Sequence, residues 1–239
     1  MKSSAYYLQK DVYFCLSGRH CVILDARTDR YLGVDRREFE LLSLQFEQEA
    51  EAASPPISSP GFRPRTCTLA DELVAAGILT MERENSKQVL PTSFLLPVTI
   101  LLDADYRPPT FAELWALPTF IAGCIQSQHW LNRQIFHATL SAVQSRAARG
   151  RHKQPLSTKR VRALVSTFRS LRMYFPHKYL CLFDSLALLN FLASYGSYPT
   201  WVFGVQAEPF CAHCWVQQDN VLLNDTVERV SMYTPIMTV

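Results

Sequence analysis

The chain of 239 residues predicts an α+β fold in two units, on three observations. Three β-like runs and two helical patterns fill the chain up to residue 85. A nearly continuous apolar helical segment and two further β-like runs lie in its last third. Between these parts, a segment that begins polar is interrupted by Pro91 and Pro97. We therefore expect a first domain at 1–85, a linker at 86–98 and a second domain at 99–239.

The composition is that of a globular protein with buried cores, because 48% of the residues are hydrophobic and 19% are charged. The formal net charge is only +3, and the one basic run, Arg146–Arg162, is typical of a solvated loop between helices. A nucleic-acid-binding domain is usually more basic than this. The composition therefore does not favour DNA or RNA as a partner.

Three features indicate a cytoplasmic protein without membrane association. The longest apolar run, Phe94–Leu102, is far shorter than the roughly 20 residues that cross a bilayer. The N-terminus lacks the apolar segment and the cleavage site of a secretory signal. The 7 cysteines form an odd, scattered set, which suits free thiols in a reducing compartment better than a disulfide framework.

The predicted strands of the first domain cover residues 11–18, 20–26 and 29–35 and form a meander, with a turn at Ser17–Arg19. A helix follows them, because apolar residues recur on one helical face. These apolar positions are Phe39, Leu41, Leu42, Leu44 and Phe46.

A proline-rich segment, Glu47–Arg65, separates this helix from a second one. The second helix has Thr68 as its expected N-cap, Leu69 and Leu73 on one face, and Gly77 as its stop. Three strands followed by helices describe a winged-helix-like module. From the pattern alone, such a module would bind a peptide, bind DNA or merely support its neighbour.

The stretch "DARTDRYLGVD", leading into a helix, and the closing "LADELVAAGIL" resemble the precursor-recognition element of ribosomal peptide biosynthesis. This element is similar to the peptide chaperone of pyrroloquinoline-quinone assembly. The resemblance implies that a precursor's leader adds as a strand to the edge of the third strand and lies against the last helix, with affinity from backbone hydrogen bonds. The implied peptide-binding residues are Asp29, Tyr31, Leu32, Val34, Leu69, Leu73 and Ala76.

Helical patterns also open the second domain. We expect helices at Thr110–Gln128, His129–Arg149 and Ser157–Tyr174, with Pro118 kinking or dividing the first. A fourth helix, from Cys181 to Tyr195, is apolar at nearly every position and is therefore expected to be buried on most sides.

Cys181 lies at or near the first turn of this core helix, because Pro176 limits how far back the helix extends. Unpaired backbone N–H groups and the positive end of the helix dipole stabilise a thiolate at such a position. A cysteine in a core is more often an inert hydrophobic residue. The position alone therefore does not establish a nucleophile.

The runs "FCAHCWVQ" and "VLLND" are separated by turn-forming residues and predict a β-hairpin. With a three-residue loop, Gln218–Asn220, His213 lies directly opposite Asp225, about 5 Å away at Cβ. The carboxylate then accepts the imidazole N–H. A two-residue loop would place the two side chains on opposite faces, so the pairing depends on the loop length.

Cys211, His213 and Cys214 offer an alternative, a structural zinc site. In a strand, the first two point to one face and Cys214 to the other, so the three cannot converge on one ion without a bulge. We therefore expect no metal, with Cys214 as a buried strand residue and Cys211 as a neighbour of the site.

A cysteine at a helix start, a histidine on a strand and an aspartate on the next strand form the set that thiol catalysis requires. Cys181, His213 and Asp225 in this order resemble the papain-like core of transglutaminases. The segments "YLCLFDSLALLNFLASYG", "WVFGVQAEPFCAHCWVQQDNVLLND" and "YTPI" are similar to the B proteins of lasso peptide biosynthesis. Those proteins often have Ala where Cys214 stands and Glu where Gln217 stands, but neither position belongs to the triad.

The resemblance implies a cysteine peptidase that cleaves the leader from a lasso peptide precursor without a cofactor. The core peptide would pass to an ATP-dependent, asparagine-synthetase-like cyclase. Three alternatives remain open: an acyltransferase with the same triad, a non-catalytic precursor peptide chaperone, and a zinc-stabilised, DNA-binding winged helix.

Overall fold

The computed structural model describes residues 6–51, 65–84, 86–87, 89, 94–101, 108–150, 154 and 156–239. The chain divides into two compact units, Met1–Thr92 with Ala207–Pro209, and Ser93–Gln206 with Phe210–Val239. Much of the predicted proline-rich loop, at residues 52–64, and residues 151–153 and 155 of the basic run lie outside the described residues.

The first unit contains the predicted three-stranded meander. Its strands are β2 (Val12–Ser17), β3 (His20–Asp25) and β4 (Arg30–Asp35), antiparallel in the order β2-β3-β4. β4 is an edge strand, since no other strand in the described part of the chain pairs with its outer side.

A second small sheet in this unit has the order β5-β1-β6. Its strands are β1 (Tyr7–Gln9), β5 (Leu79–Thr80) and β6 (Ser86–Lys87). The pairing of β6 with β1 places Ser86 and Lys87 in the first unit, although the sequence predicts them in the linker.

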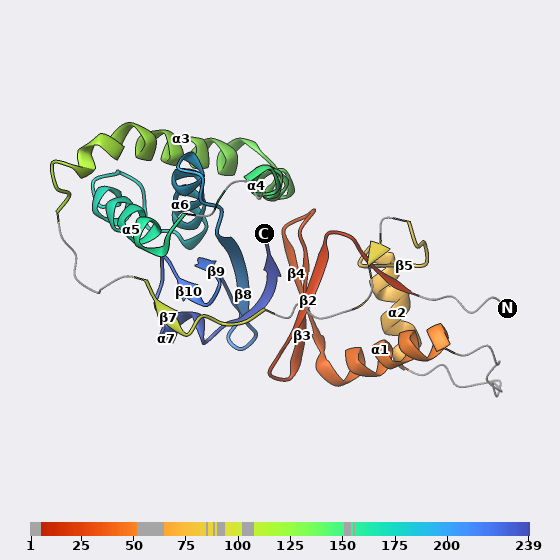
Figure 1. The fold of residues 1–239 in the computed structure, drawn as a ribbon. Helices are drawn as coiled ribbons and strands as arrows, with labels where there is room; N and C mark the ends of the chain where they lie inside the picture. The colour runs from red at the N-terminus through yellow and green to blue at the C-terminus, as the bar shows by residue number, and fades with distance from the viewer. Residues whose placement is uncertain are drawn as a thin grey trace, which may run out of the picture. The chain divides into compact units, whose positions relative to one another are not determined.

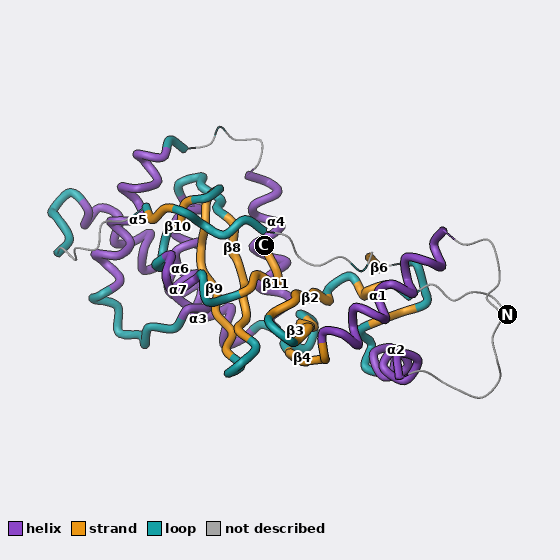
Figure 2. The backbone as a smooth tube through the Cα atoms, turned by 90° about the horizontal axis from the view of Figure 1, so that it is seen from below, coloured by secondary structure: helices purple, strands orange, loops and turns teal. Residues whose placement is uncertain are grey.

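Helix α1 (Arg36–Glu51) continues directly from β4, as Figure 2 shows. Asp35 caps it, because its Oδ1 accepts the backbone N–H of Arg37 at 2.9 Å. Phe39 and Leu42 enter the core of the unit, whereas Leu41, expected on the same face, is 55% exposed. That expectation is wrong because a helix turns by about 100° per residue, so adjacent positions diverge. The side chains of Leu44 and Phe46 lie outside the described part.

Helix α2 (Arg65–Ala75) begins three residues before Thr68, so the predicted N-cap is wrong. Its predicted stop is confirmed, because Gly77 has φ 69°. The N–H of Gly77 donates to the Val74 carbonyl and the N–H of Ile78 to the Leu73 carbonyl, both at 2.9 Å. These two bonds form a Schellman motif, which needs a left-handed residue and therefore favours glycine.

The second unit is built on a five-stranded sheet of order β11-β8-β9-β10-β7, and Figure 2 shows β8 and β9 side by side. The strands are β7 (Thr99–Ile100), β8 (Thr200–Gln206), β9 (Cys211–Gln218), β10 (Val221–Leu222) and β11 (Thr234–Thr238). β8 and β9 are predicted by the sequence. The edge strands β7 and β11 are not predicted, because they are short and carry no alternating pattern.

The helices of this unit are η1 (Glu113–Ala116, a 3₁₀-helix), α3 (Leu117–Arg133), α4 (Phe136–Gly150), α5 (Thr158–Arg172), α6 (Cys181–Ser194) and α7 (Val227–Val230). Pro118 starts α3 instead of kinking a longer helix, as proline suits the first turn. In Figure 1, α6 lies between the sheet and α3. None of the described helices is long and apolar enough to cross a membrane.

The two faces of this sheet carry different layers. α6 packs on the β9 face that carries Cys214, whose sulfur lies 3.9 Å from Ser185 Oγ. The opposite face buries Trp215 and Val202 with Val230 of α7. The catalytic chemistry predicted for β9 must therefore be assembled from groups on both sides of one strand.

Candidate active site

Cys181 is the first residue of α6. The N-cap, Leu180, has extended backbone with φ −131° and ψ 127°. The backbone N–H of Cys181 is therefore among the first four of the helix, which find no acceptor inside it. Asp184 accepts the N–H of Leu180 through Oδ2 at 2.9 Å and so caps this end. The sulfur thus sits at the positive end of a core helix.

A buried arginine holds the loop in front of Cys181. Arg172 is only 4% exposed, and its Nε lies 2.5 Å from Asp184 Oδ1. Its other guanidinium nitrogens donate, at 3.1–3.2 Å, to the carbonyls of Phe175, His177 and Lys178. The position of the sulfur therefore depends on a single guanidinium that ties α5 to α6.

His213 and Asp225 are paired as predicted. His213 is 5% exposed, and its Nε2 lies 2.5 Å from Asp225 Oδ2. The carboxylate also accepts the backbone N–H of Thr226 at 2.8 Å through Oδ1, which fixes its orientation. The imidazole nitrogen on the other side of the ring, Nδ1, is left for the sulfur of Cys181.

The predicted route to this pairing is wrong, because the hairpin loop has two residues. Val221 pairs with Gln218, so the turn is Asp219–Asn220, with φ 53° at Asp219. In a continuous ladder this register would put His213 and Asp225 on opposite faces. Pairing by β10 ends at Leu222, and residues 223–225 bend, which lets Asp225 reach His213 around the strand edge.

The early end of β10 opens the edge of β9, and the backbone groups along it find other partners. The Val216 carbonyl still accepts the N–H of Leu223 at 2.9 Å. The Val216 N–H donates to the side-chain Oδ1 of Asn224 at 2.7 Å. The side-chain amide of Asn224, next to Asp225, thus accepts the hydrogen bond that a strand partner would otherwise accept.

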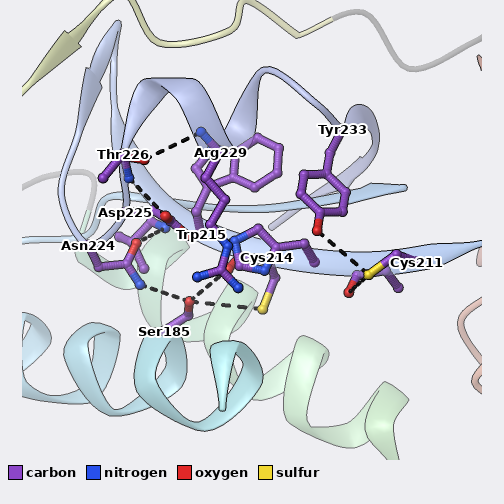
Figure 3. Close-up of polar contacts among 12 residues, drawn as sticks. Ser185, Cys211, Cys214, Trp215, Asn224, Asp225, Thr226, Arg229 and Tyr233 are labelled. Atoms are coloured by element: carbon purple, nitrogen blue, oxygen red, sulfur yellow. Dashed lines mark hydrogen bonds and ion pairs between the residues drawn. The ribbon is translucent and has the colours of Figure 1, made fainter. Parts of the chain in front are cut away.

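The next backbone group along this edge, the Cys214 carbonyl, is bound by a residue of α6. The hydroxyl of Ser185 donates to the Cys214 carbonyl at 3.3 Å and accepts from Asn224 Nδ2 at 2.9 Å. Figure 3 shows Ser185 below β9, joined to both Asn224 and Cys214. The Cys214 N–H donates to the sulfur of Cys181. The opened edge of β9 is therefore where the sulfur, the imidazole and the carboxylate meet.

The sulfur of Cys181 carries a negative charge in this environment. Its pKa is lowered to about 4, first by the hydrogen bond from the Cys214 thiol. Partial burial acts in the opposite direction, and the hydrogen bond and charge of His213 lower the pKa further. A cysteine with this pKa is a thiolate at neutral pH, the form that attacks carbonyl carbon.

His213 is the matching cation. Burial alone would lower its pKa, but the Asp225 carboxylate and the Cys181 sulfur outweigh burial and raise the pKa to about 9. Burial also opposes ionisation of Asp225, yet the imidazole and the Thr226 N–H bring its pKa below the ordinary value. At neutral pH the three groups are a thiolate, an imidazolium and a carboxylate.

Two aromatic rings pack near the His213 imidazole. Tyr233 lies 5.0 Å from it and Trp215 6.1 Å, between ring centroids. Gly204 is its cross-strand partner on β8, and a Cβ there would lie 2.9 Å from the Trp215 ring and 3.0 Å from Tyr233 Cβ. The close packing of these rings therefore requires glycine at this position.

Cys211 is exposed, and its sulfur lies 3.6 Å from the hydroxyl of Tyr233 (Figure 3). β9 alternates without a bulge through Cys211, His213 and Cys214. Across the residues that the structure describes, no three His, Cys, Asp or Glu side chains are grouped to hold a metal ion.

Comparison with known families bears on this site. Residues 130–238 match the transglutaminase-like superfamily. The matched segment holds Cys181, His213 and Asp225, and it supports a papain-like core in the second unit. It indicates cysteine peptidase or acyltransferase-like activity. No curated protein and no solved structure matches the chain.

The residues predicted to bind a leader lie in the first unit in three kinds of environment. Leu32 is 40% exposed on β4, Asp29 has φ 53° in the turn before it, and Ala76 is exposed at the end of α2. By contrast, Val34 and Leu73 are buried in the core of the unit. The half-buried positions are Tyr31 and Leu69.

Four residues of the site were missed by sequence reasoning. Asp184 carried a signal, because a lone acid three residues after the first residue of an apolar helix indicates a cap. Arg172 carried none, because its contact with Asp184 joins two helices whose packing the sequence does not show. Ser185 and Asn224 carried none, because they lie 39 residues apart and their contact depends on where β10 ends.

Proposed function

We propose that the protein is a cysteine peptidase that removes the leader from a lasso peptide precursor. The observation that carries the proposal is the thiolate of Cys181 held beside the His213–Asp225 pair at the opened edge of β9. The transglutaminase-like match over this segment supports the reaction class. The resemblance of the segments around these residues to lasso B proteins supplies the substrate class.

In this mechanism the thiolate of Cys181 attacks the carbonyl carbon at the junction of leader and core. Charge develops on the carbonyl oxygen, and the backbone N–H of Cys181, at the start of α6, is one donor to it. His213, already protonated, gives its proton to the leaving amine of the core peptide. The leader remains as a thioester on Cys181.

Hydrolysis completes the cycle. His213, now neutral, takes a proton from a water molecule as the water attacks the thioester carbonyl. The leader leaves as a carboxylic acid, and the sulfur returns to the thiolate. Asp225 stays ionised throughout and keeps the proton-bearing nitrogen of the ring directed towards it.

The first unit would recognise the leader by strand addition. β4 offers an edge that no described strand occupies, and backbone pairing along such an edge gives affinity. Leu32, Tyr31 and Ala76 would contact the leader with their side chains. Val34 and Leu73 are buried, so Val34 would contribute its backbone and Leu73 would support the surface from below. Asp29 would lie at the end of the added strand.

Tethering the leader would raise the local concentration of the junction at Cys181. The freed core amine would be the substrate of an ATP-dependent, asparagine-synthetase-like cyclase. The cyclase is therefore the proposed partner protein. No cofactor takes part in the proposed reaction.

The test is incubation of the full chain with a precursor peptide, followed by mass determination of the products. A free leader acid and an intact core peptide support the peptidase. A leader joined to an added amine through a new amide would instead establish the acyltransferase, which uses the same triad. A chain that binds the leader and forms neither product would be a peptide chaperone.

A further inference from the structure

Cys214 is a second sulfur at the site, and it takes no covalent part in the proposed peptide cleavage. It is 3% exposed and follows His213 on β9, on the face covered by α6. Its thiol lies within hydrogen-bond reach of the Cys181 sulfur and 3.9 Å from Ser185 Oγ. The strongest acceptor for its S–H is the charged sulfur, because ionised acceptors bind donors more strongly.

The two sulfurs differ in access. Cys181 is half-exposed and can meet a solute, whereas Cys214 is sealed between β9 and α6. Burial raises the pKa of the Cys214 thiol well above its ordinary value, so this sulfur does not react with solutes itself. An oxidised Cys181 would nevertheless meet Cys214 as its nearest thiol.

We propose that Cys181 and Cys214 form a redox modification site, in which a hydroperoxide oxidises Cys181 and Cys214 closes a reversible disulfide with it. The inference concerns the two sulfurs alone and does not depend on which peptide the protein cleaves.

The reaction balances in two steps. The Cys181 thiolate attacks the outer oxygen of hydrogen peroxide, the O–O bond breaks, and the hydroxide released takes a proton to leave water and a sulfenic acid. The Cys214 sulfur then attacks the Cys181 sulfur, the S–OH bond breaks, and the hydroxyl leaves as water with the Cys214 proton. Two thiols have lost two electrons, and the peroxide has gained them.

The hydrogen-bond network favours the second step. Cys214 is positioned through its own backbone, since its N–H meets Cys181 and its carbonyl meets Ser185. A dithiol reductant reopens the bond by thiol exchange. The disulfide would remove the nucleophile while it persists and would protect Cys181 from irreversible oxidation to the sulfinic acid.

Cys211 provides a matched control on the same strand. It lies three residues before Cys214 and is exposed, but its sulfur is directed to the Tyr233 hydroxyl. It is more accessible to peroxide than Cys214, so a reaction governed by accessibility alone would involve Cys211.

The experiment treats the full chain with hydrogen peroxide, alkylates the remaining thiols under denaturing conditions, and maps peptides by mass spectrometry. We expect a cross-linked peptide pair containing Cys181 and Cys214, with both thiols lost together and both recovered after dithiothreitol. In Cys214→Ser, Cys181 should instead proceed to sulfinic acid, which dithiothreitol does not reverse. Cys211→Ser should behave like the parent chain.

Sulfinic acid at Cys181 of the parent chain with an intact Cys214 thiol would overturn the proposal, as would a disulfide between Cys181 and Cys211. If Cys214→Ser fails to fold, the peptides mapped from the oxidised parent chain test the proposal without it. Disulfide formation is measured on the protein without a precursor peptide. Failure of precursor cleavage and failure of disulfide formation are therefore separate results.

Discussion

Two strand edges in this protein are used in opposite ways. The outer edge of β4 in the first unit has no strand partner among the described residues. The edge of β9 in the second unit is opened only where β10 stops, and there each backbone group of Val216 and Cys214 is matched by a specific group. An edge left open suits recognition of a chain, whereas an edge filled by side chains positions reactive groups.

Loss of the nucleophile is the strongest test of this division. We expect Cys181→Ala to lower precursor cleavage by on the order of 10⁶-fold, as loss of a nucleophile does in comparable triads. Leader affinity, measured by fluorescence polarisation with a labelled leader peptide, should remain within a factor of two or so of the parent value. Equal loss of binding and cleavage would contradict the separation of the two edges.

The arginine behind the β9 edge should matter for stability. Arg172→Ala leaves the partly buried Asp184 without its cation, which costs up to about 3–5 kcal/mol in comparable pairs. All four tryptophans lie beyond residue 92, so their fluorescence during urea unfolding reports the second unit.

The matched control for this substitution removes both charges, as Arg172→Met with Asp184→Leu. It should recover much of the stability, because no uncompensated charge remains. If Arg172→Ala unfolds at the urea concentration of the parent chain, the ion pair does not hold the loop before Cys181.

The pH profile tests the charge state assigned to the site. Cys181 is deprotonated above its pKa of about 4 and His213 is protonated below its pKa of about 9, so kcat/KM should rise through the first value and fall through the second. Asp225→Asn removes the carboxylate that raises the pKa of His213. The basic limb should therefore move to lower pH, with cleavage reduced roughly 10²-fold. An unmoved limb would show that Asp225 does not act through His213.

The smallest expected effect lies at the open edge. Leu32→Asp on β4 should weaken leader binding about tenfold, since a charge replaces one apolar contact and the backbone pairing remains. Cleavage at saturating precursor should be unchanged. Leu41→Asp is the matched control, because Leu41 is an exposed leucine of the same unit that lies on α1 and not on β4. Equal weakening by both would mean that the leader does not bind along β4.

The elements that bear the site follow from local patterns, and most of their contacts do not. The apolar run after Pro176 identifies α6 and so places Cys181 at its start, and the alternating runs identify β8 and β9. The contact of His213 with Asp225 was predicted from a regular hairpin with the wrong loop length. It forms because β10 ends after two residues and the chain bends at residues 223–225.

Which individual side chains are buried is set by tertiary structure. Arg172 is one of several basic residues on α5, and nothing in its sequence context marks it as buried. Leu41 looks like a core residue in the sequence, yet the helix direction leaves it exposed. A pattern of apolar spacing identifies a helix better than it identifies which neighbouring residue faces the core.

Gly204 gives a way to disturb the base from a distance. It lies on β8, opposite His213, and even the methyl group of alanine would force the buried Trp215 ring to move. The rings of Trp215 and Tyr233 form the wall on which the imidazole rests. A single methyl group at residue 204 would therefore change the orientation of His213 without removing any ionisable group of the site.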